Sequence, residues 1–76
     1  MQIEVLGSGC AKCKLLAERA EEAARRLGMD FTLVKVTDYP AIVARGVLST
    51  PGLMVDGMVK TQGRVPTVAE LLELLR

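Results

Sequence analysis

The sequence predicts an α/β fold, with one four-stranded mixed sheet and helices on both of its faces. Two observations carry this prediction: short β-type segments alternate with helical segments, and an Asp-Gly dipeptide joins two short apolar runs. Strands that alternate with helices pair in parallel, whereas runs joined by Asp-Gly form an antiparallel hairpin. The expected order is therefore β-α-β-α-β-β-α. Residues 1–76 are expected to form a single domain, because a chain of this length suffices for one domain and no more.

The first half of the chain is predicted to form a strand, a long helix and a second strand. Residues 2–6 alternate between polar and apolar side chains, which is typical of a strand. Residues 11–27 carry an apolar stripe at helical spacing, which consists of Cys13, Leu16, Ala17, Ala20, Ala23, Ala24 and Leu27. Gly28 is expected to end this helix. The β-branched and aromatic residues at 31–36 predict the second strand.

The second half begins with a short helix and a hairpin. Asp38 is expected to cap a helix over residues 39–45. Short apolar runs at 53–55 and 58–61 flank Asp56-Gly57, which is the strongest short-range signal for a hairpin.

The chain is predicted to finish with a capped helix. Thr67 is placed to cap it, and Glu70 stands three residues later, which predicts a reciprocal capping box. The expected buried stripe of this helix consists of Val68, Leu71, Leu72 and Leu75.

Charge and composition argue against several classes of partner. The net charge is +1, and the chain has one Phe, one Tyr and no Trp. Nucleic acids bind to concentrated basic surfaces or aromatic platforms, so no nucleic-acid partner is expected. No apolar run reaches the ~18 residues of a membrane span, and residues 1–6 are too short and too charged for a signal peptide. We expect a monomer in the cytoplasm, without a membrane partner.

The two cysteines, Cys10 and Cys13, stand where the first strand gives way to the first helix. The first N–H groups of a helix lack partners and carry partial positive charge, so they stabilise a thiolate and should lower the pKa of Cys10. A separation of three residues on a helix brings the sulfurs within range of a disulfide. We therefore expect Cys10 to be the exposed nucleophile and Cys13, on the apolar stripe, to be the buried resolving thiol.

Other roles for the pair stay open at this point. The cysteines could be small core residues, or they could hold a soft metal as half of a site shared between two chains. Metallochaperones of the heavy-metal-associated class also carry C-x-x-C after their first strand, but they end in a strand and usually have Met where this chain has Ser8. A docking module that keeps the fold without turnover is a third possibility. No metal and no cofactor are expected, and the absence of His removes every mixed Cys/His zinc site.

Three motifs together carry a family resemblance: Gly-Ser-Gly-Cys-Ala-Lys-Cys at 7–13, Ser49-Thr50-Pro51 before the hairpin, and Gly63-Arg64-Val65-Pro66 before the last helix. With the predicted order of elements, they resemble the thioredoxin superfamily, and most closely its small glutaredoxin-sized members. The resemblance covers nearly the whole chain. It implies a thiol–disulfide oxidoreductase that acts on protein disulfides and is itself reduced by an unidentified reductase.

The resemblance also implies roles for particular residues. Pro51 would be a cis-proline facing the cysteine pair, and the backbone of Thr50 would pair with an extended substrate segment. Gly9, Ala11 and Lys12 would support the site. The dipeptide Ala11-Lys12 differs from the Gly-Pro of thioredoxin and from the Pro-Tyr of many glutaredoxins.

Overall fold

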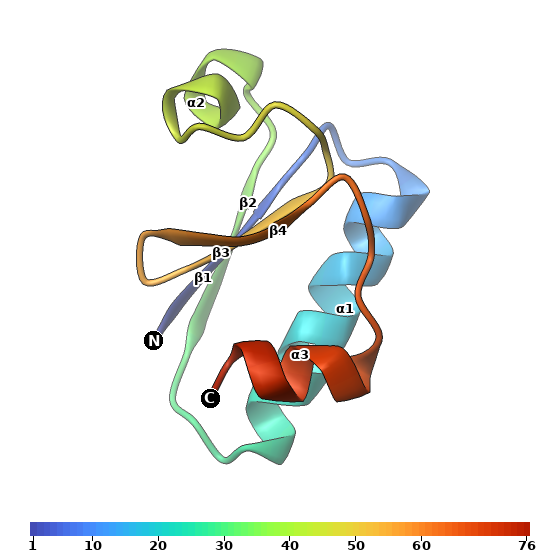
Figure 1. Cartoon of the computed structure of the whole chain (residues 1–76), viewed down its shortest axis with the longest axis vertical. Helices are drawn as coiled ribbons and strands as arrows, with labels where there is room; N and C mark the ends of the chain where they lie inside the picture. Colours follow the sequence, from blue (N-terminus) through green and yellow to red (C-terminus); the bar gives the residue numbers. More distant parts are fainter.

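The computed structural model describes all 76 residues, which form four strands and three helices (Figure 1). In chain order the elements are β1 (Gln2–Leu6), α1 (Ala11–Arg26), β2 (Thr32–Val36), α2 (Tyr39–Ala44), β3 (Gly52–Val55), β4 (Met58–Gln62) and α3 (Val68–Leu74). The predicted order of elements is confirmed, and each boundary lies within one residue of its predicted position.

The four strands form one mixed sheet in the order β2-β1-β3-β4. β1 and β2 are parallel, with Gln2 opposite Thr32, and β1 is antiparallel to β3. β3 and β4 form the antiparallel hairpin, in which a bulge between Leu53 and Met54 shifts the register. The parallel pair is joined through α1, as the alternation of strands and helices predicts.

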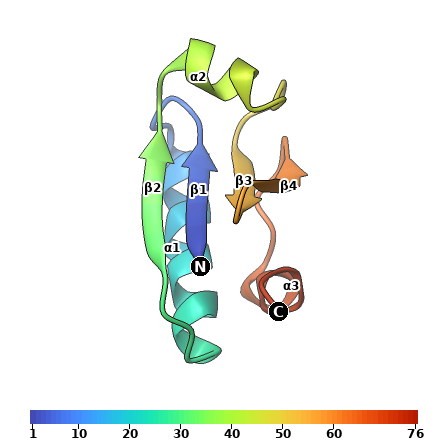
Figure 2. The same ribbon diagram turned by 90° about the vertical axis from the view of Figure 1, so that its left-hand side faces the viewer.

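Helices cover both faces of the sheet (Figure 2). Strand alternation sends Ile3 and Val5 to the face covered by α1 and α3, where eleven buried residues form the larger core cluster. The cluster consists of Ile3, Val5, Leu16, Ala17, Ala20, Ala23, Ala24, Leu53, Val55, Leu71 and Leu75. On the other face, α2 and the segment after it cover one end of the sheet with a smaller cluster of Leu6, Ile42, Val47 and Met54.

The predicted end of α1, the predicted cap of α2 and the predicted hairpin turn are all found in the structure. The N–H of Gly28 donates to the carbonyl oxygen of Arg25 at 3.0 Å, beyond the end of α1. Asp38 Oδ2 accepts from the N–H of Ala41 at 3.2 Å and caps α2. Asp56 and Gly57 have φ angles of 49° and 84°, as a tight hairpin turn requires.

The predicted capping box of α3 is only half formed. Thr67 Oγ1 accepts from the N–H of Glu70 at 3.2 Å, as expected. The carboxylate of Glu70, however, binds the guanidinium of Arg64 instead of reaching back to the N–H of Thr67. A charged donor attracts a carboxylate more strongly than a neutral N–H does, so the ion pair is the favoured partner. This pairing lowers the pKa of Glu70.

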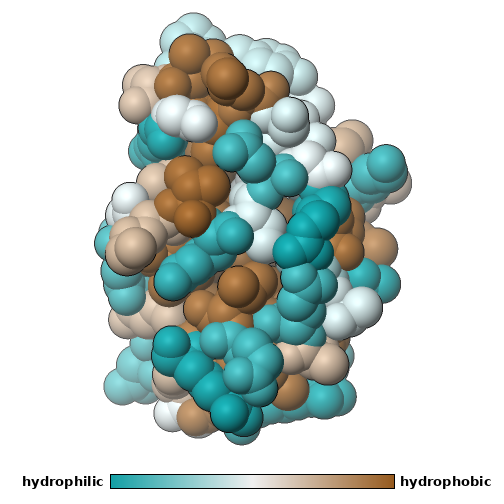
Figure 3. Space-filling model, viewed as in Figure 1, coloured by the Kyte–Doolittle hydropathy of each residue, from teal (hydrophilic) through white to brown (hydrophobic).

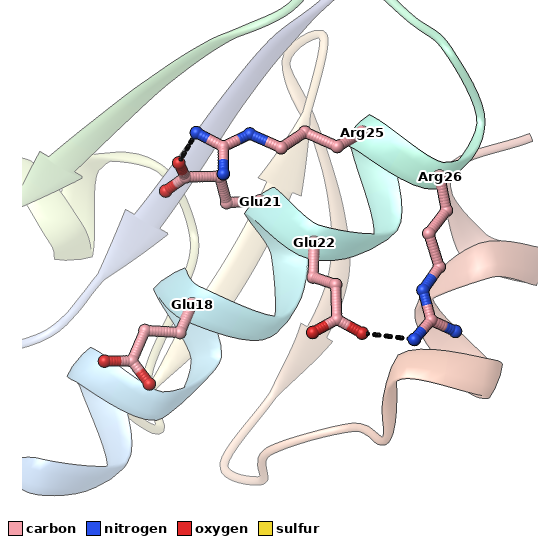
Figure 4. Close-up of a pocket in the computed structure, with 5 residues that line it drawn as sticks. All are labelled: Glu18, Glu21, Glu22, Arg25 and Arg26. Atoms are coloured by element: carbon pink, nitrogen blue, oxygen red, sulfur yellow. Dashed lines mark ion pairs between the residues drawn. The ribbon is translucent and has the colours of Figure 1, made fainter.

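The solvent side of α1 carries charged side chains in pairs (Figure 4). Arg25 pairs with Glu21 and Arg26 pairs with Glu22, each one helical turn apart, while Glu18 has no ion-pair partner. These side chains line an open hollow of about 540 Å³ that has no apolar wall. The hollow is a gap between solvated charges, and neither cysteine lines it. None of the helices is long and apolar enough to cross a membrane.

Candidate active site

The end of β1 and the start of α1 bring the two cysteines together. Cys10 is the N-cap residue of α1, with extended backbone angles, and its side chain is exposed. Cys13 lies in the first turn on the buried stripe and is 5% exposed. The two Sγ atoms are 3.0 Å apart and both residues are free thiols. The predicted arrangement of an exposed first cysteine and a buried second cysteine is confirmed.

The pKa of the Cys10 thiol is lowered, and the largest cause is the hydrogen bond that its sulfur accepts from Cys13. The backbone N–H of Cys13 contributes next, followed by smaller contributions from the N–H groups of Lys12 and Cys10, while partial desolvation opposes the shift. The direction agrees with the sequence prediction. The helix N–H groups contribute as expected, but the second thiol contributes more.

The pKa of Cys13 is raised. Burial is the largest cause, because it disfavours the charged form, and the hydrogen bond to Cys10 adds to the shift. The two sulfurs therefore differ in charge preference, with Cys10 favoured as the thiolate and Cys13 as the thiol that donates to it.

Gly7 is a site residue for which the motif at 7–13 predicted no particular role. A Cβ atom at position 7 would lie 2.2 Å from Cys13 Sγ, a distance at which something must move. Only glycine lets the Cys13 sulfur occupy this position against the end of β1. The signal in the sequence was a glycine immediately after a strand and three residues before Cys10, but the contact itself depends on how α1 folds back.

Thr50 lies beside the Cys13 sulfur, and Pro51 follows it in the chain. The same Cβ position on Gly7 is 3.8 Å from Thr50 Cβ, so Thr50 and the Cys13 sulfur adjoin one glycine. The Thr50–Pro51 peptide bond is cis, and Pro51 is fully buried. Neither the N–H nor the C=O of Thr50 takes part in a hydrogen bond within the protein, so both backbone groups are free.

The three residues expected to support the site lie around its rim. Gly9 has a φ angle of +85° and turns the chain into α1, with open space on its Cα. Ala11 and Lys12 are exposed residues of the first turn. The side chains of Ala11 and Lys12 make no hydrogen bond with either cysteine, and the contribution of Lys12 to the site comes from its backbone N–H.

Cys13 forms part of the wall of a small cavity of about 60 Å³. Its lining consists of Val5, Gly7, Gly9, Cys13, Lys14, Lys35 and Thr37. The space is larger than the roughly 10–15 Å³ that a water molecule needs. No group of three or more His, Cys, Asp or Glu side chains could hold a metal ion.

Known proteins similar to this chain are thioredoxins. The chain matches the family described as the thioredoxin domain over residues 1–76. It is 39% identical over 75 residues to a thioredoxin of Methanothermobacter thermautotrophicus, an alignment that covers 99% of this chain and 97% of that protein. It is also 39% identical over 74 residues to a thioredoxin of Methanocaldococcus jannaschii, with 97% of this chain and 85% of that protein covered.

These similarities decide between the classes that the cysteine pair left open. The alternative of a metallochaperone-like module is not supported, because both relatives are thioredoxins and the alignments cover 97% and 85% of their length. The fold, with its mixed sheet and its cysteines at the start of α1, agrees with the match over the whole chain. The chain therefore belongs to the thioredoxin superfamily of thiol–disulfide oxidoreductases.

Proposed function

We propose that this protein reduces disulfides in protein substrates, with Cys10 as the nucleophile and Cys13 as the resolving thiol. The observation that carries the proposal is the 3.0 Å contact between an exposed and a buried sulfur whose pKa values shift in opposite directions. The sulfurs need to approach by only about 1 Å to reach the length of a disulfide bond. The pair is therefore arranged to alternate between dithiol and disulfide.

The reaction has two exchange steps. The Cys10 thiolate attacks one sulfur of the substrate disulfide, which forms a mixed disulfide and releases the other substrate sulfur as a thiolate. Cys13 then gives up its proton and attacks Cys10 Sγ, which forms the Cys10–Cys13 disulfide and releases the second substrate sulfur. Two electrons pass from the cysteine pair to the substrate. An external dithiol, supplied by a reductase of the cell, returns the pair to its reduced form.

Substrate docking is assigned to Thr50 and Pro51. The free N–H and C=O of Thr50 can pair with an extended substrate segment as an added strand. Pro51, which follows Thr50 and is buried, has no N–H and so offers no donor that would compete with Thr50 for the substrate backbone. This arrangement would hold a substrate disulfide in line with Cys10.

The reduction of insulin disulfides, with dithiothreitol as the electron source, tests these roles. We expect the wild-type protein to accelerate the reaction and Cys10→Ser to abolish the acceleration. When the prereduced variant is mixed with insulin without dithiothreitol, Cys13→Ser should form a mixed disulfide that persists on a non-reducing gel, because no second thiol is present to resolve it. Equal trapping by both variants would show that the roles of the two cysteines are wrongly assigned.

A further inference from the structure

The segment Leu48–Thr50, which leads into the proposed docking step, lacks the usual means of being held in place. The side chain of Leu48 is 83% exposed, the highest value among the large apolar residues, and Ser49 is also exposed. The segment makes no backbone–backbone hydrogen bond. Burial anchors the chain only on either side, at Val47 and Pro51. In the view of Figure 3, apolar side chains gather at the end of the molecule where α2 lies.

One side chain supplies the missing hydrogen bonds. Gln62, at the end of β4, places its Oε1 atom 3.1 Å from the N–H of Leu48 and 3.4 Å from the N–H of Ser49. Both N–H groups donate to the same amide oxygen. These are the only hydrogen bonds within the protein that the segment makes.

The residue after Gln62 binds the chain immediately after this segment. The N–H of Gly63 donates to the carbonyl oxygen of Pro51 at 2.9 Å. The last residue of the edge strand β4 and the residue that follows it thus bind the chain before and after Thr50. Thr50 itself is left free, with its N–H and C=O available to a partner.

We propose that Gln62 is a positioning residue for substrate docking: it holds Leu48 and Ser49 so that Thr50 presents its backbone to an extended protein segment. The inference rests on the proposed function, because it concerns the substrate of the same cysteine pair. Gln62 acts through Thr50 and does not touch the reacting sulfurs. A segment that is already ordered loses less conformational freedom when a substrate strand pairs with it. Removing the amide oxygen should therefore weaken docking and leave the sulfur chemistry unchanged.

Three variants separate this role from a general structural one. Gln62→Leu keeps the size of the side chain and removes the acceptor, whereas Gln62→Glu keeps two acceptor oxygens. Gln2→Leu is the matched control, because Gln2 is the only other glutamine and its side chain is exposed and makes no hydrogen bond. Each variant is tested by steady-state reduction of insulin, by hydrogen exchange of the Leu48 and Ser49 amides, and by the pKa of the Cys10 thiol.

For Gln62→Leu we expect faster exchange of both amides and a rise in KM of roughly five- to tenfold, the size of one or two lost hydrogen bonds. Its kcat and its Cys10 pKa should match those of the wild-type protein, and Gln62→Glu and Gln2→Leu should retain the wild-type KM. An active Gln62→Leu protein with an unchanged KM would overturn this inference alone. A wild-type protein that fails to reduce insulin would overturn the proposed function and the inference together.

Discussion

The first turn of α1 and the body of the same helix are built for different tasks. From Leu16 to Ala24 the helix buries its apolar stripe in the larger core cluster and pairs charges on its solvent side. The first turn has no acidic residue, and Cys10 makes no capping hydrogen bond through its side chain. α2 and α3, in contrast, begin with Asp38 and Thr67, whose side-chain oxygens cap them.

This difference shows where the protein gives up stability for reactivity. An oxygen cap would occupy helix N–H groups, and a good cap contributes about 0.5–2 kcal/mol. In α1 the N–H groups of Lys12 and Cys13 instead help to lower the pKa of Cys10. The body of the helix offsets the missing cap through burial. Variants in the body should therefore change stability, and variants in the first turn should mainly change thiol chemistry.

The largest effect on stability is expected from Leu16→Ala in the body of α1. Leu16 is completely buried, so its truncation removes apolar contacts and leaves a cavity, at a cost of about 2–5 kcal/mol. Urea unfolding of the reduced protein measures this cost. Leu15→Ala is the matched control, because Leu15 is the adjacent leucine and is 39% exposed, and it should cost less than about 1 kcal/mol. Similar costs for the two variants would contradict the assigned burial.

A second large effect is expected from Gly7→Ala at the first turn. The added methyl group would lie 2.2 Å from Cys13 Sγ, so the sulfur must move. Overpacking of this kind costs about 1–3 kcal/mol, and displacement of Cys13 should slow the resolving step. Insulin reduction and trapping of the mixed disulfide measure that step. Ser8→Ala, at the exposed neighbouring position, is the control and should behave as wild type.

The pKa of Cys10 is expected to rise in Cys13→Ala. The variant removes the hydrogen bond that is the largest cause of the lowered pKa, while the helix N–H groups remain. The midpoint of the pH dependence of Cys10 alkylation should therefore move to higher pH than in the wild-type protein. Lys12→Met keeps its backbone N–H and should leave the midpoint unchanged. A shift in Lys12→Met as large as that in Cys13→Ala would place the cause in side-chain charge instead.

A smaller gain in stability is expected from Cys10→Ser, even though this variant should be inactive. Serine is a strong N-cap residue, so the free energy of unfolding of the variant should exceed that of the wild-type protein by about 0.5–1 kcal/mol. The folded state lowers the pKa of Cys10, so ionisation of Cys10 adds stability above the unfolded pKa and that stability is lost as the pH falls through the folded pKa. The advantage of Cys10→Ser should therefore be largest at acidic pH and should narrow as the pH rises. Urea unfolding of both reduced proteins across this pH range provides the comparison, and an advantage that widens with pH would contradict it.

The smallest effect is expected from Glu22→Gln on the solvent side of α1. Glu22 pairs with Arg26 at 2.7 Å, and exposed pairs at this spacing contribute about 0.3–0.5 kcal/mol. Glu18→Gln removes a carboxylate that has no ion-pair partner and serves as the control. The difference between the two variants in urea unfolding should disappear in about 1 M salt, where the Debye length is roughly 3 Å. A difference that persists in high salt would show that the pair acts through something other than its charge.

The sequence by itself determined the order of the elements, and it determined that Cys10 is exposed and Cys13 is buried. The stripe of α1, the cap at Asp38 and the Asp56-Gly57 turn all depend on residues within a few positions of one another. Local periodicity and turn chemistry act over that range, so they can be predicted without knowledge of the fold. The same range covers Cys10 and Cys13, and their exposed and buried positions follow from the stripe.

Only the tertiary structure decided which distant groups meet at the site. Gly7 became a site residue because α1 folds back and places the Cys13 sulfur against the end of β1. Gln62 reaches Leu48 across fourteen positions of the chain because β4 lies beside the segment before Pro51. Glu70 has two partners within reach along the chain, and the position of Arg64 in space decided between them. A side chain binds the strongest partner that the packed elements bring within reach. Spacing along the sequence alone does not specify how far apart in space the two groups lie.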